Sequence, residues 1–296
     1  MNASSIRRDD HSLATALSRL ERGEPLAEAD ASTLPPDLVV GMSGPPGVGK
    51  SVLVGQLLRH AAGRGCRAAV LAVDPSSSRS GGAILGDRMR MQGLGIPDGA
   101  FVRSLAARGA LGGLSLVVPA ALRAVGAWGF DLALVETVGV GQNEVDILGV
   151  ANTVIVVQSP ATGDEVQALK SGLLEIADIY VLNKSDLAGA SLSRAALTDL
   201  AARSAKDGWQ PPVVSTCATS GEGLDELWSA IRRHHEWLTE SGALAQRRRQ
   251  RLESELVLAA RAELDRRMHA SSLIRRFGDG EITQAEALRE LFCQRP

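Results

Sequence analysis

Residues 44–51 read Gly-Pro-Pro-Gly-Val-Gly-Lys-Ser, which is the spacing G-x-x-x-x-G-K-[ST] of a phosphate-binding loop. Its glycines allow backbone N–H groups to turn inward around a phosphate-sized concavity. Lys50 is then placed to reach the β- and γ-phosphates of a nucleotide, and the Ser51 hydroxyl to bind Mg²⁺. The nucleotide contacts expected in this stretch are Gly44, Pro45, Pro46, Gly47, Val48, Gly49, Lys50, Ser51 and Val52.

The residues on either side of this loop favour a phosphate site over a glycine-rich turn that matches by chance. The apolar run 38–42 precedes it as an expected strand, and residues 52–60 follow as an expected helix. The amino end of that helix would add the positive end of its dipole to the phosphate site.

Two acidic residues close apolar runs further along the chain. Residues 68–73 end in Asp74, and residues 132–135 end in Glu136. Ligands of parallel sheets bind beyond the carboxyl ends of the strands, so both carboxylates are expected near the loop as Mg²⁺ partners, with helix capping as the alternative. Gly139 is placed to offer its N–H to a γ-phosphate.

Asp87 lies in a glycine-rich stretch that begins at Gly81. Two roles stay open for its carboxylate, one at the metal or water site and one in an ion pair with Arg88 or Arg90.

The apolar run 179–182 leads into Asn183, Lys184, Ser185 and Asp186. The Asp186 carboxylate can accept hydrogen bonds from the N1–H and N2–H₂ groups of guanine, whereas adenine would leave it unpaired. The stem of Lys184 can stack over the base. A loop that suits closure over the base follows the next apolar run, and its expected contacts are Cys217, Ala218 and Thr219.

The elements that must position these residues are apolar runs that alternate with helical patterns. Most runs are continuous, which is typical of parallel strands covered on both faces by helices. The sequence therefore predicts the α/β class, with a mostly parallel sheet flanked by helices. The expected strands are 38–42, 68–73, 132–135, 153–157, 179–182 and 213–214, with 101–105 as a further candidate.

Three regions are expected along the chain. Residues 1–37 form an N-terminal helical segment that Pro35 and Pro36 stop, and residues 38–235 form the nucleotide-binding domain. Residues 236–296 form a helical arm, with a long amphipathic helix over 236–270 and a short one over 284–292. The arm either packs on its own sheet or makes a dimer contact.

Composition excludes several classes of function. Hydrophobic residues make up 45% of the 296, enough for a sizeable core, and the net charge of −2 gives no sign of broad nucleic-acid binding. The basic run 247–251 favours a solvated helix face over a phosphate patch. The three cysteines (Cys66, Cys217 and Cys293) have neither disulfide nor zinc spacing, which fits a reducing compartment. No apolar stretch suggests a membrane span, and the N-terminus does not read as a targeting peptide, so we expect a cytoplasmic protein.

Together these residues resemble the MeaB/ArgK family of GTPases, which attend adenosylcobalamin-dependent methylmalonyl-CoA mutase. The resemblance runs from the phosphate loop to the C-terminus. Its specific stretches are Leu-Ala-Val-Asp-Pro-Ser-Ser at 71–77, Gly-Gly-Ala-Ile-Leu-Gly-Asp-Arg at 81–88, Arg-Gly-Ala-Leu-Gly-Gly-Leu at 108–114, Glu-Thr-Val-Gly-Val-Gly-Gln at 136–142 and Gly-Asp-Glu-Val-Gln-Ala-Leu-Lys at 163–170.

The resemblance implies a GTP hydrolase that acts as a chaperone for the mutase, gating the loading of intact cofactor and the release of damaged cofactor. It implies a homodimer formed through the C-terminal arm, and a loop at 163–170 that responds to the partner. The residues implied at the Mg²⁺ and water site are Ser51, Asp74, Asp87 and Glu136, and those implied in catalysis are Lys50, Asp87, Glu136, Asp164 and Lys170.

The chain also departs from the family pattern. Cys217 stands where related sequences usually have Ser, which puts the base-closing contact in doubt. Gln142 lies three residues beyond Gly139 rather than next to it, so it is not assigned to the attacking water.

Three other functions share some of these sequence features. A GTPase that delivers nickel would need soft or imidazole ligands near the switch loops, and the pair His234 and His235 favours a solvent face instead. An ATP-dependent kinase or transport accessory protein is disfavoured by Asn183–Asp186, because this motif indicates guanine rather than adenine. A nucleotide-gated binding module that scarcely hydrolyses would differ only in turnover. Methylmalonyl-, isobutyryl- and ethylmalonyl-type mutases all stay open as the partner.

Overall fold

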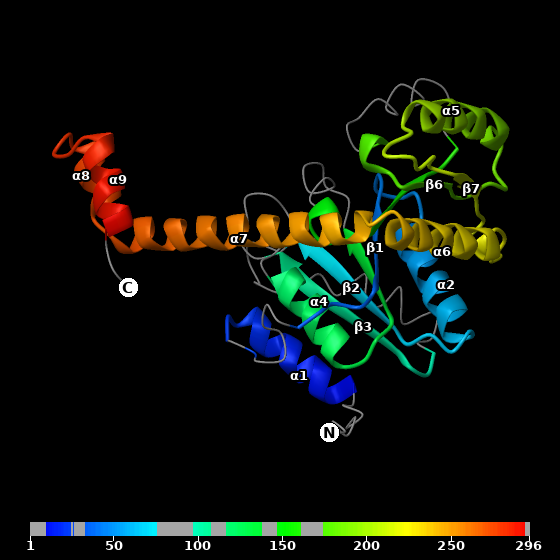
Figure 1. The fold of residues 1–296 in the computed structure, drawn as a ribbon, viewed down its shortest axis with the longest axis horizontal. Helices are drawn as coiled ribbons and strands as arrows, with labels where there is room; N and C mark the ends of the chain where they lie inside the picture. The colour runs from blue at the N-terminus through cyan, green and yellow to red at the C-terminus, as the bar shows by residue number, and fades with distance from the viewer. Residues whose placement is uncertain are drawn as a thin grey trace. The chain divides into compact units, whose positions relative to one another are not determined.

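The structure is a computed structural model, which describes residues 10–24, 26, 33–75, 97–107, 117–137, 147–160 and 174–293 (Figure 1). The chain divides into two compact units, Met1–Arg249 and Gln250–Pro296.

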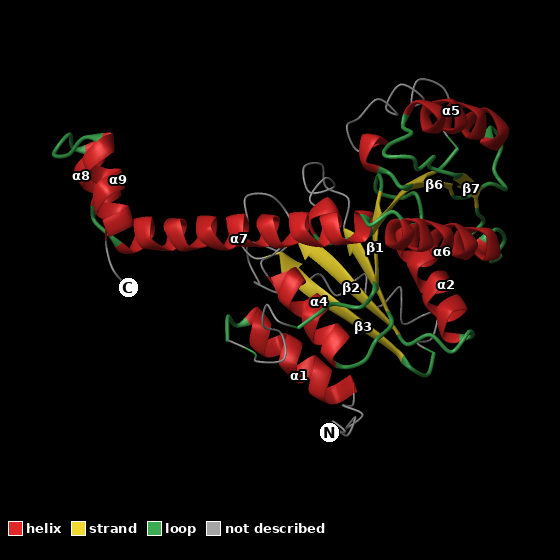
Figure 2. Cartoon of the chain, in the orientation of Figure 1, coloured by secondary structure: helices red, strands yellow, loops and turns green. Residues whose placement is uncertain are grey.

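The first unit is built on a seven-stranded sheet in the order β3-β2-β4-β1-β5-β6-β7, and every described strand pair is parallel (Figure 2). The predicted α/β fold is confirmed, and the candidate run 101–105 is part of the edge strand β3. The strands are β1 (Leu38–Ser43), β2 (Ala68–Pro75), β3 (Ala100–Ala107), β4 (Leu132–Thr137), β5 (Thr153–Gln158), β6 (Ile179–Leu182) and β7 (Val213–Ser215), with a short 3₁₀ helix, η4 (Leu174–Ile176), before β6.

Helices cover both faces of this sheet (Figure 1). The residues of β1 and β4 are buried throughout, and neighbours such as Val39 and Val40 belong to separate apolar clusters because successive strand side chains point to opposite faces. One cluster takes residues from α1 (Asp10–Glu21), α4 (Val117–Ala127) and α5 (Ala190–Arg203). The other takes residues from α2 (Lys50–Ala62) and α6 (Leu224–Glu240). The continuous apolar strands are thus the middle layer of three.

The helix expected in the N-terminal segment is α1. It buries Leu13, Ala16 and Leu17 in the apolar cluster that also takes residues from α4 and α5. Arg103 of β3 donates to the Glu21 carboxylate at 2.6 Å, so an ion pair fastens the end of α1 to the edge strand.

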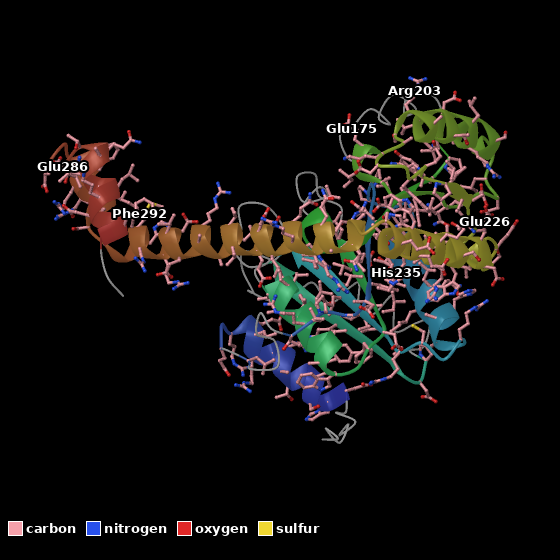
Figure 3. The ribbon with its side chains drawn as sticks, viewed as in Figure 1. Glu175, Arg203, Glu226, His235, Glu286 and Phe292 are labelled. Carbon is pink, nitrogen blue, oxygen red and sulfur yellow. The ribbon has the colours of Figure 1, made fainter. Side chains whose placement is uncertain are left out.

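The predicted solvent face for His234 is wrong. His234 is fully buried, with its Nδ1 2.9 Å from Thr153 Oγ1 and its Nε2 3.4 Å from Asp178 Oδ1. Burial lowers the pKa of His234 to about 4, because the charged imidazolium would lose its hydration there. His235, the next residue along α6 (Figure 3), is half-buried, so the two histidines do lie in different surroundings.

The expectation of a solvated face is also wrong for part of the basic run. Arg247 donates to both carboxylate oxygens of Asp178 at 2.7 Å and to the Asn152 carbonyl at 2.5 Å. Arg248 pairs with the exposed Asp37 at 3.0 Å. These arginines therefore tie the start of a C-terminal helix to segments that precede β1, β5 and β6.

The single long helix predicted over 236–270 is two helices. The chain leaves α6 at Glu240, turns through Ser241 and Gly242, and resumes as α7 (Ala243–Ala270). Gly242 has φ +75°, a left-handed conformation that glycine adopts without strain. The one glycine of the predicted helix thus marks its break.

The second unit holds the rest of α7, α8 (Leu273–Gly278) and α9 (Gln284–Cys293). Leu273 and Leu291 are buried, and Arg276 pairs with Glu290 at 2.7 Å to link α8 with α9. Figure 3 labels Glu286 and Phe292 on α9, and Phe292 is 66% exposed. Within the described residues, no helix has the length and apolar character needed to cross a membrane.

Candidate functional site

The phosphate-binding sequence forms the connection between β1 and α2. Gly44 has φ +143°, and a Cβ there would lie 2.2 Å from the Val157 carbonyl oxygen of β5. Gly49 has φ +93°, and a Cβ there would lie 2.4 Å from Asn183 Nδ2. Glycine is therefore required at both positions, since any side chain would push the loop away from β5 and from the segment after β6.

Lys50 is the first residue of α2 and is only 6% exposed. Its Nζ donates to the carbonyl oxygens of Gly44 at 2.5 Å and Pro45 at 2.9 Å. A buried ammonium needs such partners because it has given up hydration. The charge is therefore held against the loop itself, beside the N–H groups that begin α2.

Ser51 of α2 and Glu136 of β4 are in contact at the carboxyl end of the strands. Ser51 Oγ donates to Glu136 Oε1 at 2.6 Å, and Glu136 is only 2% exposed. The register of β1 with β4 pairs Met42 with Glu136, so the end of β4 lies directly beside the start of the loop. Asp74 lies at the same edge, one residue beyond the pairing of Val73 with Thr137. A hydroxyl and a carboxylate oxygen in contact are hard donors that fit Mg²⁺.

Asn183 connects the segment after β6 with two other segments. Its Nδ2 donates to the Val48 carbonyl at 2.8 Å, and its Oδ1 accepts from Thr216 Oγ1 and from the Ala218 N–H, each at 3.1 Å. The buried amide thus joins the phosphate loop to the loop after β7.

Lys184 and Asp186 follow Asn183 beyond the carboxyl end of β6. Lys184 has φ +58°, and its Nζ donates to the Gly47 carbonyl at 2.8 Å, so its stem lies across the phosphate loop. Asp186 is exposed. The structure therefore brings the two halves of the expected nucleotide site together.

The loop after β7 is held from within by Cys217. This side chain is buried, its Sγ lies 3.2 Å from Thr219 Oγ1, and its N–H donates to the Glu222 carbonyl at 3.0 Å. The cysteine therefore occupies the inside of the loop, where it supports Ala218 and Thr219.

Sequence reasoning missed Gln56. This residue of α2 donates from Nε2 to the Ala218 carbonyl at 2.9 Å. Its signal in the sequence is faint, being one amide among the buried apolar positions of α2.

Four expected site residues, Asp87, Gly139, Asp164 and Lys170, lie outside the described residues. Within the described part of the chain, no group of His, Cys, Asp and Glu side chains could by itself hold a metal ion.

An all-parallel sheet whose phosphate loop touches Asn183 on one side and Glu136 on the other places this chain in the class of P-loop GTPases. Within that class, the family model described as methylmalonyl Co-A mutase-associated GTPase MeaB matches residues 22–272. The chain belongs to this family and is a GTP hydrolase.

Several curated relatives of this chain are named as GTPases. A putative GTPase of Pyrococcus horikoshii is 49% identical over 222 residues, which cover 74% of this chain and 70% of that protein. GTPase ArgK of Escherichia coli is 37% identical over 270 residues, covering 84% and 80%. The mouse methylmalonic aciduria type A homolog, a mitochondrial protein, is 39% identical over 216 residues, covering 71% of this chain and 52% of that protein.

Among solved structures, a crystal structure of a LAO/AO transport system kinase superposes with a TM-score of 0.62 at 26% identity. The match covers 96% of this chain and 97% of that one. The similarity therefore extends over both units of the chain.

Proposed function

We propose that this GTPase serves an adenosylcobalamin-dependent acyl-CoA mutase of the methylmalonyl-CoA type, gating the loading of its cofactor and protecting it from inactivation. The family description and the name of the mouse relative support this partner. The contact of Ser51 with Glu136 beside Lys50 carries the enzymatic part of the proposal, because it puts a hydroxyl, a carboxylate and an ammonium at one strand edge.

In the proposed reaction, Lys50 exchanges the carbonyls of Gly44 and Pro45 for the β- and γ-phosphates of GTP. Ser51 and Glu136, with Asp74 and Asp87, would hold Mg²⁺, which when bound would supply positive charge to the phosphate oxygens. Glu136 also keeps the Ser51 hydroxyl oriented toward the site, because the two side chains already share a hydrogen bond.

Guanine is selected in this proposal by Asp186, whose exposed carboxylate accepts from N1–H and N2–H₂. Asn183 keeps the base segment at a fixed distance from the phosphate loop, and Lys184 covers one face of the base. Cys217, Ala218 and Thr219 supply the opposite wall. Gly139 would offer its N–H to the γ-phosphate.

The remaining parts of the proposal concern regulation. The segment 163–170 follows β5 in the sequence, and Asp164 and Lys170 would pass the partner's influence to the site. Residues 1–37, 38–235 and 236–296 would serve as N-terminal helical segment, nucleotide-binding domain and arm, and the arm would hold two chains together as a homodimer.

The experiment that tests this function is GTP hydrolysis in the presence of purified mutases. We expect the methylmalonyl-, isobutyryl- or ethylmalonyl-type enzyme of the same cell to form a complex with the chain and to raise its hydrolysis rate. A Lys50→Ala chain should show no such rise. If none of these mutases binds the protein or changes its turnover, the partner assignment is wrong, although the GTPase site would stand.

A further inference from the structure

Gln56 lies on the helix that begins with Lys50, yet its hydrogen bond reaches the loop after β7. The side chain is half-buried, and both of its neighbours, Gly55 and Leu57, are buried. Its Nε2 donates to the Ala218 carbonyl oxygen at 2.9 Å. The bond joins the helix of the phosphate loop to the expected wall of the base site.

This contact fixes more than one carbonyl group. The Ala218 carbonyl and the Thr219 N–H belong to the same planar peptide, in which C=O and N–H point in opposite directions. Because Gln56 holds the oxygen toward α2, the Thr219 N–H points away from α2. On the other side of Ala218, its own N–H donates to Asn183 Oδ1 at 3.1 Å. Ala218 is therefore held through both peptides that flank it.

The neighbouring N–H groups of this loop already have partners. That of Thr216 donates to the Leu182 carbonyl, that of Cys217 to the Glu222 carbonyl, and those of Ser220 and Gly221 to the Cys217 carbonyl. Among the contacts of the described residues, the Thr219 N–H donates to no acceptor. It is therefore a donor of this loop that is free to meet a ligand.

A donor at this place distinguishes purine bases. Guanine carries the carbonyl oxygen O6 where adenine carries an amino group, so an N–H pairs with the first and opposes the second. Asp186 reads the adjacent N1–H and N2–H₂ edge in the proposed site. The two contacts together would cover three neighbouring polar positions of guanine.

We propose that Gln56 is a positioning residue for base selection, which aims the Thr219 N–H at guanine O6 by holding the Ala218–Thr219 peptide. The inference rests on the base site assigned to Asp186. It also joins the two ends of the nucleotide, since one rigid helix carries Lys50 at its start and Gln56 at its base-facing contact.

The test compares the binding of GDP with that of 6-thio-GDP by calorimetry. The analogue keeps N1–H and N2–H₂ for Asp186 but replaces O6 with sulfur, a weak acceptor. Gln56→Met has similar volume and no donor, so we expect the dissociation constant of GDP to rise about tenfold and that of 6-thio-GDP to change less than about threefold. Gln56→Glu, which also lacks a donor when ionised, should give the same loss of selectivity.

Gln210→Met is the matched control. Gln210 also donates from Nε2 to a backbone carbonyl, that of Ala201 at 2.5 Å, but it lies before β7 whereas the base loop lies after it. We expect this variant to bind both nucleotides as the unmodified chain does. Equal weakening of GDP and 6-thio-GDP by Gln56→Met, or no weakening of either, would overturn the inference.

Asp186→Asn separates this inference from the base site on which it rests. If that variant gains affinity for xanthine nucleotides while Gln56→Met weakens both ligands equally, only the role of Gln56 is wrong. If Asp186→Asn leaves base preference unchanged, the base site itself is misassigned, and the role of Gln56 is overturned with it.

Discussion

Asp186 is an exposed carboxylate, and it is the side chain that we propose selects the base. Asp186→Asn should weaken GTP binding on the order of a hundredfold and should strengthen binding of XTP, because the amide can donate to the base's O2 carbonyl. Titration calorimetry with GTP, XTP and ATP measures this change. Equal affinity of the unmodified chain for ATP and GTP would contradict it.

Lys50 is the second residue whose loss has a clear expected result. Its ammonium donates to the Gly44 and Pro45 carbonyls of the loop, which phosphate oxygens would replace. Lys50→Ala should lower kcat/KM for GTP by on the order of a hundredfold or more, since a preorganised charge at the transferring phosphoryl group is lost. Lys206→Ala, an exposed lysine before β7, serves as the control and should hydrolyse GTP normally.

At the scale of the residue, spacing was enough to predict that Ser51 and Glu136 meet beside the phosphate loop. Lys50 and Ser51 sit within one local motif, and Glu136 ends an apolar run, so their meeting follows from parallel topology. Gln56 could not be found this way, because its partner Ala218 is distant in the sequence and contributes a backbone carbonyl. Every residue has such a carbonyl, so the type of the partner residue gives no signal.

At the scale of the element, Asp178 organises the ends of three segments. It accepts two hydrogen bonds from Arg247 of α7 and one from the Val154 N–H of β5, and the Trp209 Nε1–H donates to its carbonyl at 2.8 Å. Arg247→Met keeps the apolar stem but leaves the buried carboxylate without its guanidinium. We expect a loss of about 3 kcal/mol in the free energy of unfolding, measured with urea.

Arg248→Met is the control for this effect, since its partner Asp37 is exposed. A surface pair of that kind contributes about 0–1 kcal/mol, so the two adjacent arginines should differ clearly. Equal losses from the two variants would mean that burial of Asp178 does not determine the strength of the pair.

His234 packs against both Trp209 and Trp237, and it makes the same region sensitive to acid. Its pKa is lowered to about 4 in the folded chain, so the unfolded chain binds more protons between that pH and about 6.5. Stability must then fall as pH falls through this window. We expect His234 to account for about 2 kcal/mol of lost stability between pH 7 and pH 5.

Urea unfolding of the nucleotide-free protein at both pH values measures the contribution of His234. His234→Gln should flatten the loss of stability on acidification, whereas His269→Gln, at an exposed histidine of α7, should leave it unchanged. An unaltered pH dependence in His234→Gln would show that the buried imidazole stays neutral for no thermodynamic cost.

The same elements show where sequence prediction stops. The strands were predicted within a residue or two because continuous apolar runs signal burial on both faces. The burial of His234 and the inward turn of Arg247 were missed because both depend on Asp178, which is distant in sequence. The break at Gly242 was missed because helical periodicity continues on both sides of it.

At the scale of the whole molecule, the described part of the second unit exposes more large apolar side chains than it buries. Leu256 is 70% exposed, Val257, Phe277 and Phe292 are also more than half exposed, and only Leu273 and Leu291 are buried among its described apolar residues. Units this small rarely bury enough apolar surface to be stable without further support. We propose that these exposed side chains contact a second copy of the chain in a homodimer.

Light scattering after size exclusion should therefore give a mass twice that of one chain. Leu256→Glu together with Phe292→Glu should shift the protein to the mass of a single chain, because a carboxylate buried in an apolar contact loses its hydration. Leu192→Glu is the matched control, since Leu192 is 67% exposed on α5 in the first unit and should not affect the mass. A single-chain mass for the unmodified protein at micromolar concentration would show that these side chains face water or a different partner.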